Sequence, residues 1–203
     1  GVDLWSGHDA LTVARDLRSA PMPQPNLPMA STFLVFADVL QAIARDGPRA
    51  TALAFCGVVL LVLGLSLSRK PRRAGLRDAA WTLGALGLGV WLFGGLAGAL
   101  DLRLNMLNFI ALPITFGIGV DYAANIVQRR RVSGETVGDC VRTTGGAVAL
   151  CSVTTVIGYS SLFVAHNRAL QSFGILANLG ELACLAVALV LLPAWMQVGR
   201  ART

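Results

Sequence analysis

Long runs of apolar residues, separated by short polar links, dominate this chain. Crossing the roughly 30 Å hydrocarbon core of a bilayer takes about 20 residues of helix, and each run is close to that length or longer. The pattern predicts an all-α integral membrane protein with five transmembrane helices, preceded by a short helical extracytoplasmic segment. The predicted spans cover residues 50–68, 79–100, 104–128, 143–165 and 169–196.

Positive charges favour one orientation for these spans. Lys and Arg gather in the links after the first and third spans and in the tail after the fifth, whereas the other two links hold only Arg103 and Arg168. Loops rich in Lys and Arg are retained on the cytoplasmic side of a membrane. We therefore expect residues 1–48 to lie outside and the C-terminus inside.

Residues 1–48 are too few to form a core of their own, because domains below about 40 to 60 residues are marginal without help. Their pattern predicts a helix near 8–19 and a second near 30–46, with a proline-rich break between them. We interpret the segment as the C-terminal remnant of a larger extracytoplasmic domain, so the chain is expected to be part of a longer polypeptide. A transmembrane domain then covers residues 49–198, and residues 199–203 form a cytoplasmic tail.

Composition narrows the possible classes of protein. Hydrophobic residues make up 55% of the sequence and charged residues 14%, which excludes an ordinary soluble domain. The net charge of +6 is spread over short clusters between apolar runs, whereas a nucleic-acid-binding protein concentrates its basic residues on one face. The four cysteines lack the spacing of a metal site. We expect no enzymatic activity, no metal, no cofactor and no nucleic-acid partner.

Two acidic residues lie inside predicted spans, Asp121 in the third and Glu181 in the fifth. An ionised carboxylate at mid-bilayer costs at least about 2.5–3.5 kcal/mol and normally faces a bundle interior or a wet cavity. Gly117 lies one turn before Asp121 and Asn125 one turn after it, on the same helix face. Asp121 is therefore a candidate proton carrier, with a structural contact between helices or the counter-charge of an arginine elsewhere as the alternatives.

Span four carries hydroxyl groups that can hydrogen-bond a carboxyl in either protonation state, because each hydroxyl is both a donor and an acceptor. Glu181 gives a weaker signal than Asp121, and it is open to two interpretations, a contact between helices or a direct role in proton transfer. The expected supporting polar face consists of Asn125, Ser152, Thr154, Thr155 and Glu181. Small residues allow helices to approach closely in a membrane, and this packing role is predicted for Gly117, Gly119 and Gly158.

The ordered motifs of the last three spans resemble a known family. They are GIGVDYAANIVQRRR at 117–131, then T-T-x-x-G-Y at 154–159 and F-G-x-x-A-x-x-G at 173–180, before a terminal L-P at 192–193. Together they resemble the C-terminal half of the resistance-nodulation-division superfamily, in the branch of MmpL-type lipid exporters and near its hopanoid-transporter-like group. The resemblance covers roughly residues 30–198.

This resemblance implies a proton-driven exporter of lipids or hydrophobic compounds in the bacterial inner membrane. Asp121 and Tyr122 match the family's proton-relay pair, which an equivalent pair in the first half of the transporter completes. The implied partners are membrane lipids, a lipid-like or hydrophobic substrate and the missing N-terminal half, and the resemblance is compatible with a homo-oligomer.

Two other classes of function remain as alternatives. A non-transporting sensor or accessory protein could share this helical core, since sterol-sensing and protein-export relatives do so. An intramembrane aspartyl protease is disfavoured, because Val120 interrupts its glycine-x-glycine-aspartate motif and no other span holds an aspartate.

Overall fold

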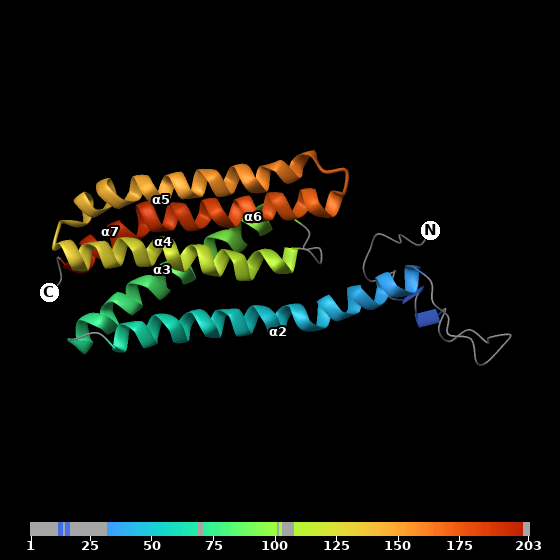
Figure 1. Cartoon of the computed structure of the whole chain (residues 1–203), viewed down its shortest axis with the longest axis horizontal. Coiled ribbons are helices and arrows are strands. Elements are labelled where there is room, and N and C mark those ends of the chain that lie inside the picture. The colour runs from blue at the N-terminus through green and yellow to red at the C-terminus, as the bar shows by residue number, and fades with distance from the viewer. Residues whose placement is uncertain are drawn as a thin grey trace. The chain divides into compact units, whose positions relative to one another are not determined.

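In a computed structural model of the chain, all regular elements that the described residues form are helices. The structure describes residues 12, 13, 15, 16, 32–68, 71–100, 102 and 108–200. Five helices or helix runs are long and apolar enough to cross a membrane, so the predicted all-α membrane protein is confirmed. The elements are α2 (Thr32–Leu67), α3 (Arg72–Ala99), α4 (Asn108–Ser133), α5 (Val137–Ser160), η1 (Ser161–Val164), α6 (Arg168–Ala186), η2 (Val187–Leu191) and α7 (Leu192–Arg200) (Figure 1).

The chain divides into two compact units, Gly1–Ala50 and Thr51–Thr203. Most of the predicted helix near 8–19 lies outside the described residues. The predicted helix near 30–46 and the first span belong to the single helix α2, which includes Pro48. Proline lacks the N–H that would bond four residues back. The helix nevertheless continues into the long apolar run that follows.

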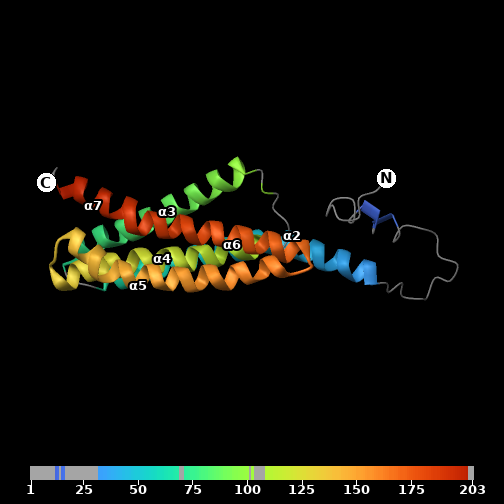
Figure 2. The ribbon, with the colours of Figure 1, turned by 90° about the horizontal axis from the view of Figure 1, so that it is seen from above.

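The second unit is a bundle in which α6 packs against α3, α4 and α5. Figures 1 and 2 show α4, α5 and α6 side by side along most of their length, with α3 crossing them at an angle. Short links at 134–136 and 165–167 make α5 antiparallel to α4 and to α6. The span that contains α6 is the most buried of the five.

The last span contains a π-helical turn, η2, between α6 and α7. Pro193 lies just after it and has no N–H to donate back to Leu189, so an ordinary helix would be interrupted here. A π turn widens the helix locally and accommodates such a mismatch. Val187 and Ala188 of this turn are buried in the main apolar core.

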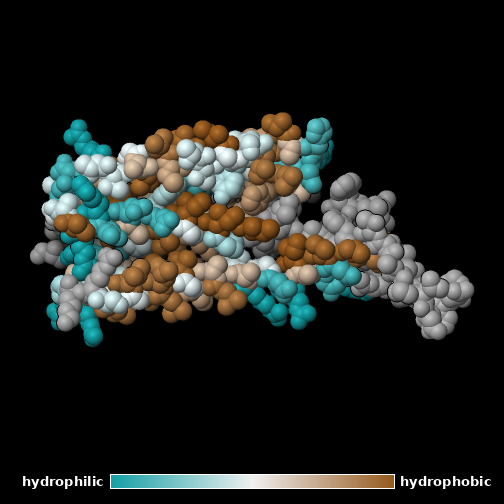
Figure 3. Space-filling view, viewed as in Figure 1, coloured by the Kyte–Doolittle hydropathy of each residue, from teal (hydrophilic) through white to brown (hydrophobic). Residues whose placement is uncertain are grey.

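Apolar side chains fill the interior and also cover the outside of the bundle. Figure 3 shows hydrophobic residues over the middle of the visible face and hydrophilic residues gathered at the end where α4 stops and α5 starts. Trp81 of α3 packs edge-on against Trp195 of α7, with ring centroids 4.6 Å apart. A surface of this kind suits a hydrocarbon solvent, since it leaves apolar groups outside as well as inside.

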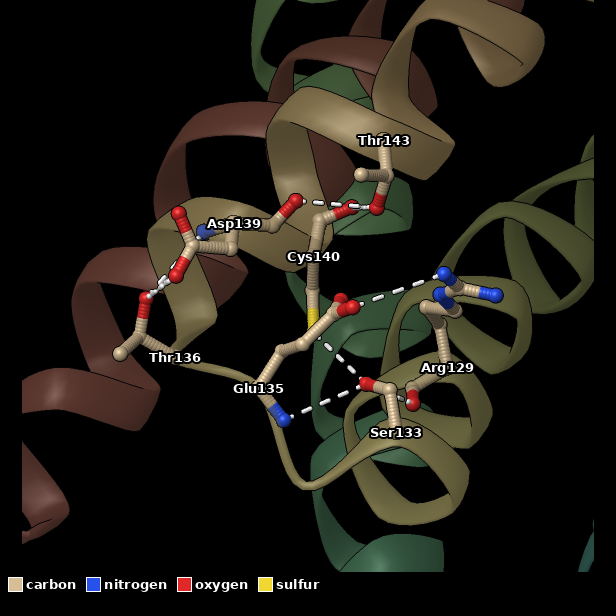
Figure 4. Close-up of polar contacts among 7 residues, drawn as sticks. All are labelled: Arg129, Ser133, Glu135, Thr136, Asp139, Cys140 and Thr143. Carbon is tan, nitrogen blue, oxygen red and sulfur yellow. Dashed lines mark hydrogen bonds and ion pairs between the residues drawn. The ribbon is translucent and has the colours of Figure 1, made fainter.

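Ionic contacts join the helices at the arginine-rich end. The Arg131 guanidinium of α4 donates to the Asp78 carboxylate of α3 at 2.8 Å, and both side chains are largely shielded from solvent. The three-residue link to α5 is held by its own network, drawn in Figure 4, in which Ser133 accepts from the Glu135 amide and Glu135 pairs with Arg129 at 3.6 Å. Gly134 has a φ of +67°, a conformation that glycine adopts without strain.

Between residues 129 and 142 there is no separate surface helix, because α4 runs on to Ser133 and α5 begins at Val137. Thr136 caps α5 by accepting from the Asp139 amide at 3.3 Å and donating to its carboxylate at 2.6 Å. These bonds satisfy the first turn, so α5 begins at Val137, well before the apolar run.

Of the three glycines predicted to aid packing, Gly119 does so in the described bundle. A Cβ at Gly119 would lie 2.8 Å from Cys184 Sγ and 3.2 Å from Leu86 Cδ1, so α4 meets α6 and α3 closely at this point. A Cβ at Gly117 or Gly158 would meet no atom within 4 Å. Their expected packing role does not occur among the described residues, because both glycines lie on exposed faces of their helices.

Replacing Gly119 with alanine should therefore lower the stability of the protein. Overpacking of a filled core typically costs about 1–3 kcal/mol, so we expect the midpoint of thermal unfolding of the purified protein to fall. Gly117→Ala is the matched control, because it adds the same methyl group two residues away on the open face. Equal midpoints for the two variants would contradict the close contact at Gly119.

Candidate functional site

Asp121 lies on an exposed face of α4, where it lines a groove of about 500 Å³ shared with α2. It makes no hydrogen bond or ion pair with any residue that the structure describes. Phe55 of α2 and Phe116 of α4 pack edge-on beside this region, with centroids 5.6 Å apart. The lining residues are Gly57, Val58, Leu61, Pro113, Ile114, Gly117, Ile118, Val120 and Asp121.

The Asp121 face of α4 is unsuited to lipid. Gly117, Asp121, Asn125 and Gln128 are all exposed and recur at helical spacing, so they form one stripe of small and polar residues. A carboxylate and two amides facing hydrocarbon would have nothing to replace their hydration. The stripe therefore requires water or further protein against it.

Tyr122 points the other way, into the bundle. Its side chain is 4% exposed, and its hydroxyl donates a hydrogen bond to Glu181 Oε1 of α6. Successive residues of an α-helix point about 100° apart, so one helix turn presents Asp121 to the groove and Tyr122 to the core. The two members of the predicted relay pair thus lie in different surroundings.

Glu181 is more enclosed than its sequence pattern indicated. Its side chain is 1% exposed, and no other acidic or basic side chain in the described part of the chain is classed as buried. One carboxyl oxygen accepts from Tyr122, while Oε2 is buried without a hydrogen-bond partner among the described residues. The one sequence signal that pointed to it was the charge itself, placed mid-span.

Ser152 of α5 completes a group of three polar residues from three helices, which we call the Tyr122 cluster (Tyr122, Ser152 and Glu181). Ser152 is 1% exposed, its side chain lies beside the Tyr122 phenol, and its hydroxyl has no hydrogen-bond partner in the described structure. A phenol oxygen donates one hydrogen bond and can accept others. The cluster therefore places two buried oxygen atoms without hydrogen-bond partners, Glu181 Oε2 and Ser152 Oγ, around the Tyr122 hydroxyl, which can both donate and accept a proton.

Other members of the predicted supporting face have different partners. Thr154 and Thr155 both donate to the Cys151 carbonyl of their own helix, at 2.7 and 3.0 Å, and neither bonds to Asp121. Threonine hydroxyls in apolar surroundings commonly bond to the preceding turn. Asn125 shares the exposed stripe with Asp121, as expected, but Ser152 and Glu181 gather around Tyr122.

Tyr122→Phe should destabilise the protein, because it leaves Glu181 Oε1 buried without its donor. An unsatisfied buried acceptor costs about 1–3 kcal/mol, which a lower midpoint of thermal unfolding would report. Tyr159→Phe removes the same atom from a tyrosine that packs edge-on against Phe173 and has no hydroxyl partner within the described residues. The interpretation fails if both variants unfold at the same temperature.

Comparison with known proteins agrees with this architecture. The sequence model of the MMPL family matches residues 9–202. The chain is 32% identical over 108 residues to membrane protein MJ1562 of Methanocaldococcus jannaschii, covering 50% of this chain and 28% of that protein. It is 33% identical over 132 residues to Protein patched homolog 1 of Danio rerio, covering 58% of this chain and 11% of that protein. The chain thus matches only part of the length of these relatives, and by its sequence and its helices it belongs to the MMPL family.

Proposed function

We propose that this chain is part of a proton-driven MMPL-family exporter of lipids or hydrophobic compounds, in which Asp121 takes up and releases the proton. The observation that carries this proposal is the position of Asp121, inside a membrane span and on a groove, with no cation or hydrogen-bond donor bound to it in the described structure. A carboxyl that must load and release protons needs access, which the groove supplies.

The exposed stripe on α4 indicates how the exporter would be completed. Asp121 and Asn125 face away from α3, α5 and α6, so the other half of the transporter would cover them. Proton binding at Asp121 would then change the contact between two halves, which can rock against one another as repeat-built transporters do. Lipid-like substrate would be handled largely outside these spans.

The alternative is a non-transporting sensor or accessory protein that uses the same helices. Membership of the MMPL family and the five-span fold are compatible with both functions. Only the exporter requires that Asp121 change its protonation state, so the carboxyl is the group to test.

Asp121→Asn should abolish proton uptake into liposomes that contain the protein and a pH-sensitive dye, under an imposed pH gradient. The amide keeps the size of the carboxyl but cannot carry the proton. Asp46→Asn is the matched control, because Asp46 lies in an exposed pair with Arg49 and its change should leave uptake intact. Unchanged uptake in Asp121→Asn would overturn the role of Asp121, and absence of uptake in the wild-type protein would favour the sensor.

We further propose that the arginine-rich end of the bundle is cytoplasmic. In a background without the native cysteines, His166→Cys should react with a membrane-impermeant maleimide in intact bacterial spheroplasts, because residue 166 lies in the exposed link before α6. Gly138→Cys, exposed at the opposite end, should react only after the membrane is opened. The reverse pattern of labelling would refute this orientation.

A further inference from the structure

The Tyr122 cluster contains polar atoms that neither the helices nor the proposed role of Asp121 explains. Glu181 Oε2 and Ser152 Oγ are both buried and both lack a hydrogen-bond partner in the part of the chain that is described. Buried polar atoms in folded proteins are almost always bonded to protein or to an ordered water molecule. Two such atoms around a single phenol indicate a place where protons or water are exchanged.

An ionised Glu181 would be poorly compensated in this setting. Besides Tyr122 and Ser152, the nearby titratable groups are Tyr159 from α5 and Cys184 from its own helix, which form no hydrogen bond with it, and none of the four is a cation. On the α3 side, Gly89 lies against Cys184, one turn along α6 from Glu181, and Leu86 lies against Gly119 of α4; both are apolar. A buried charge without a partner costs several kcal/mol, and among the described residues the Tyr122 hydroxyl is the one hydrogen-bond donor that offsets this cost at Glu181.

We propose that Glu181 is a second proton-carrying residue, placed in the core of the bundle and loaded through Tyr122 and Ser152. This inference rests on the proposed proton-coupled function and adds a residue to it. The relay starts from an ionised Glu181, and the hydrogen bond from the Tyr122 hydroxyl to Glu181 Oε1 is the contact through which the proton would arrive.

Loading is a relay in which every proton is accounted for. The Ser152 hydroxyl, which lies beside the phenol, first turns toward Tyr122 Oη. A water molecule carrying an excess proton then protonates the Ser152 oxygen as the Ser152 hydrogen passes to Tyr122 Oη, and the Tyr122 hydrogen passes to Glu181 Oε1. Serine and tyrosine end as neutral hydroxyls, water is released, and the carboxylate becomes a neutral acid. Both relay residues can do this because each is at once a donor and an acceptor.

Protonation of Glu181 would reverse the hydrogen bond that joins α4 to α6. Before loading, Tyr122 donates to the carboxylate; after loading, the carboxyl hydrogen can point back at Tyr122 Oη, which leaves the phenol hydrogen for Ser152. A charge-assisted bond is thereby replaced by a weaker neutral one. Because Tyr122 follows Asp121 in the same helix turn, loading in the core would loosen the segment of α4 that presents Asp121.

Infrared difference spectroscopy of the whole protein in lipid, titrated between about pH 4 and pH 9 to bracket ordinary carboxyl titration, tests this proposal. The wild-type protein should show a protonated-carboxyl band that is lost in Glu181→Gln. The band should persist in Glu135→Gln, a matched control whose carboxylate pairs with Arg129 outside the core. Identical carboxyl bands in the wild-type protein and Glu181→Gln would overturn the proposal.

A second variant covers the case in which Glu181→Gln fails to fold. Tyr122→Phe keeps the carboxyl but removes its hydrogen-bond donor, so the frequency of the Glu181 band should shift, whereas Tyr159→Phe should leave it in place. An unshifted band in Tyr122→Phe would contradict loading through the phenol.

These spectra are independent of the transport assay. If the Glu181 band is present while Asp121→Asn takes up protons normally, the exporter proposal fails and the buried proton site stands. If Asp121→Asn is inactive and the Glu181 band is absent, the exporter stands and Glu181 is a structural contact between helices.

Discussion

The arrangement of this bundle depends on the cost of placing a carboxyl group among membrane helices. Water is not available in the hydrocarbon core to stabilise a charge, so each acidic side chain needs a protein partner, a wet surface or a proton. The chain solves this problem in two ways. Glu181 is enclosed at the centre with a tyrosine hydroxyl on one oxygen, and Asp121 is left on the outer face of α4 beside a groove.

Close packing makes the enclosure possible. Gly119 lets α4 approach Cys184 of α6, and Gly180 of α6 meets Thr115 of α4, where a Cβ would lie 2.6 Å from the threonine hydroxyl. Small residues at such crossings are the common means by which membrane helices associate, because hydrophobicity alone does not drive them together in lipid. The same approach brings the Tyr122 phenol within reach of Glu181.

The sequence was sufficient to predict the number of spans and the family, because both depend on long apolar runs and on ordered motifs. It was insufficient for the site, because the rotation of each helix about its axis depends on packing with its neighbours. Helical spacing grouped Asp121 with Asn125 correctly, but it could not show that Tyr122 turns inward to Glu181 or that Thr154 bonds to its own helix. The sequence pattern also predicted a helix near 30–46 and a separate span at 50–68, whereas α2 continues through Pro48. Proline usually interrupts a helix.

The short link between α4 and α5 has a mechanical consequence. Only three residues join the two helices, Gly134, Glu135 and Thr136. Hydrogen bonds on both sides of this link hold its conformation. The two helices can therefore move together as one rigid hairpin that pivots at its arginine-rich end. The ion pair between Arg131 and Asp78 holds this end of the hairpin to α3. With that end fixed, a small tilt of α4 moves the opposite end of the helix farther than it moves the residues near the link.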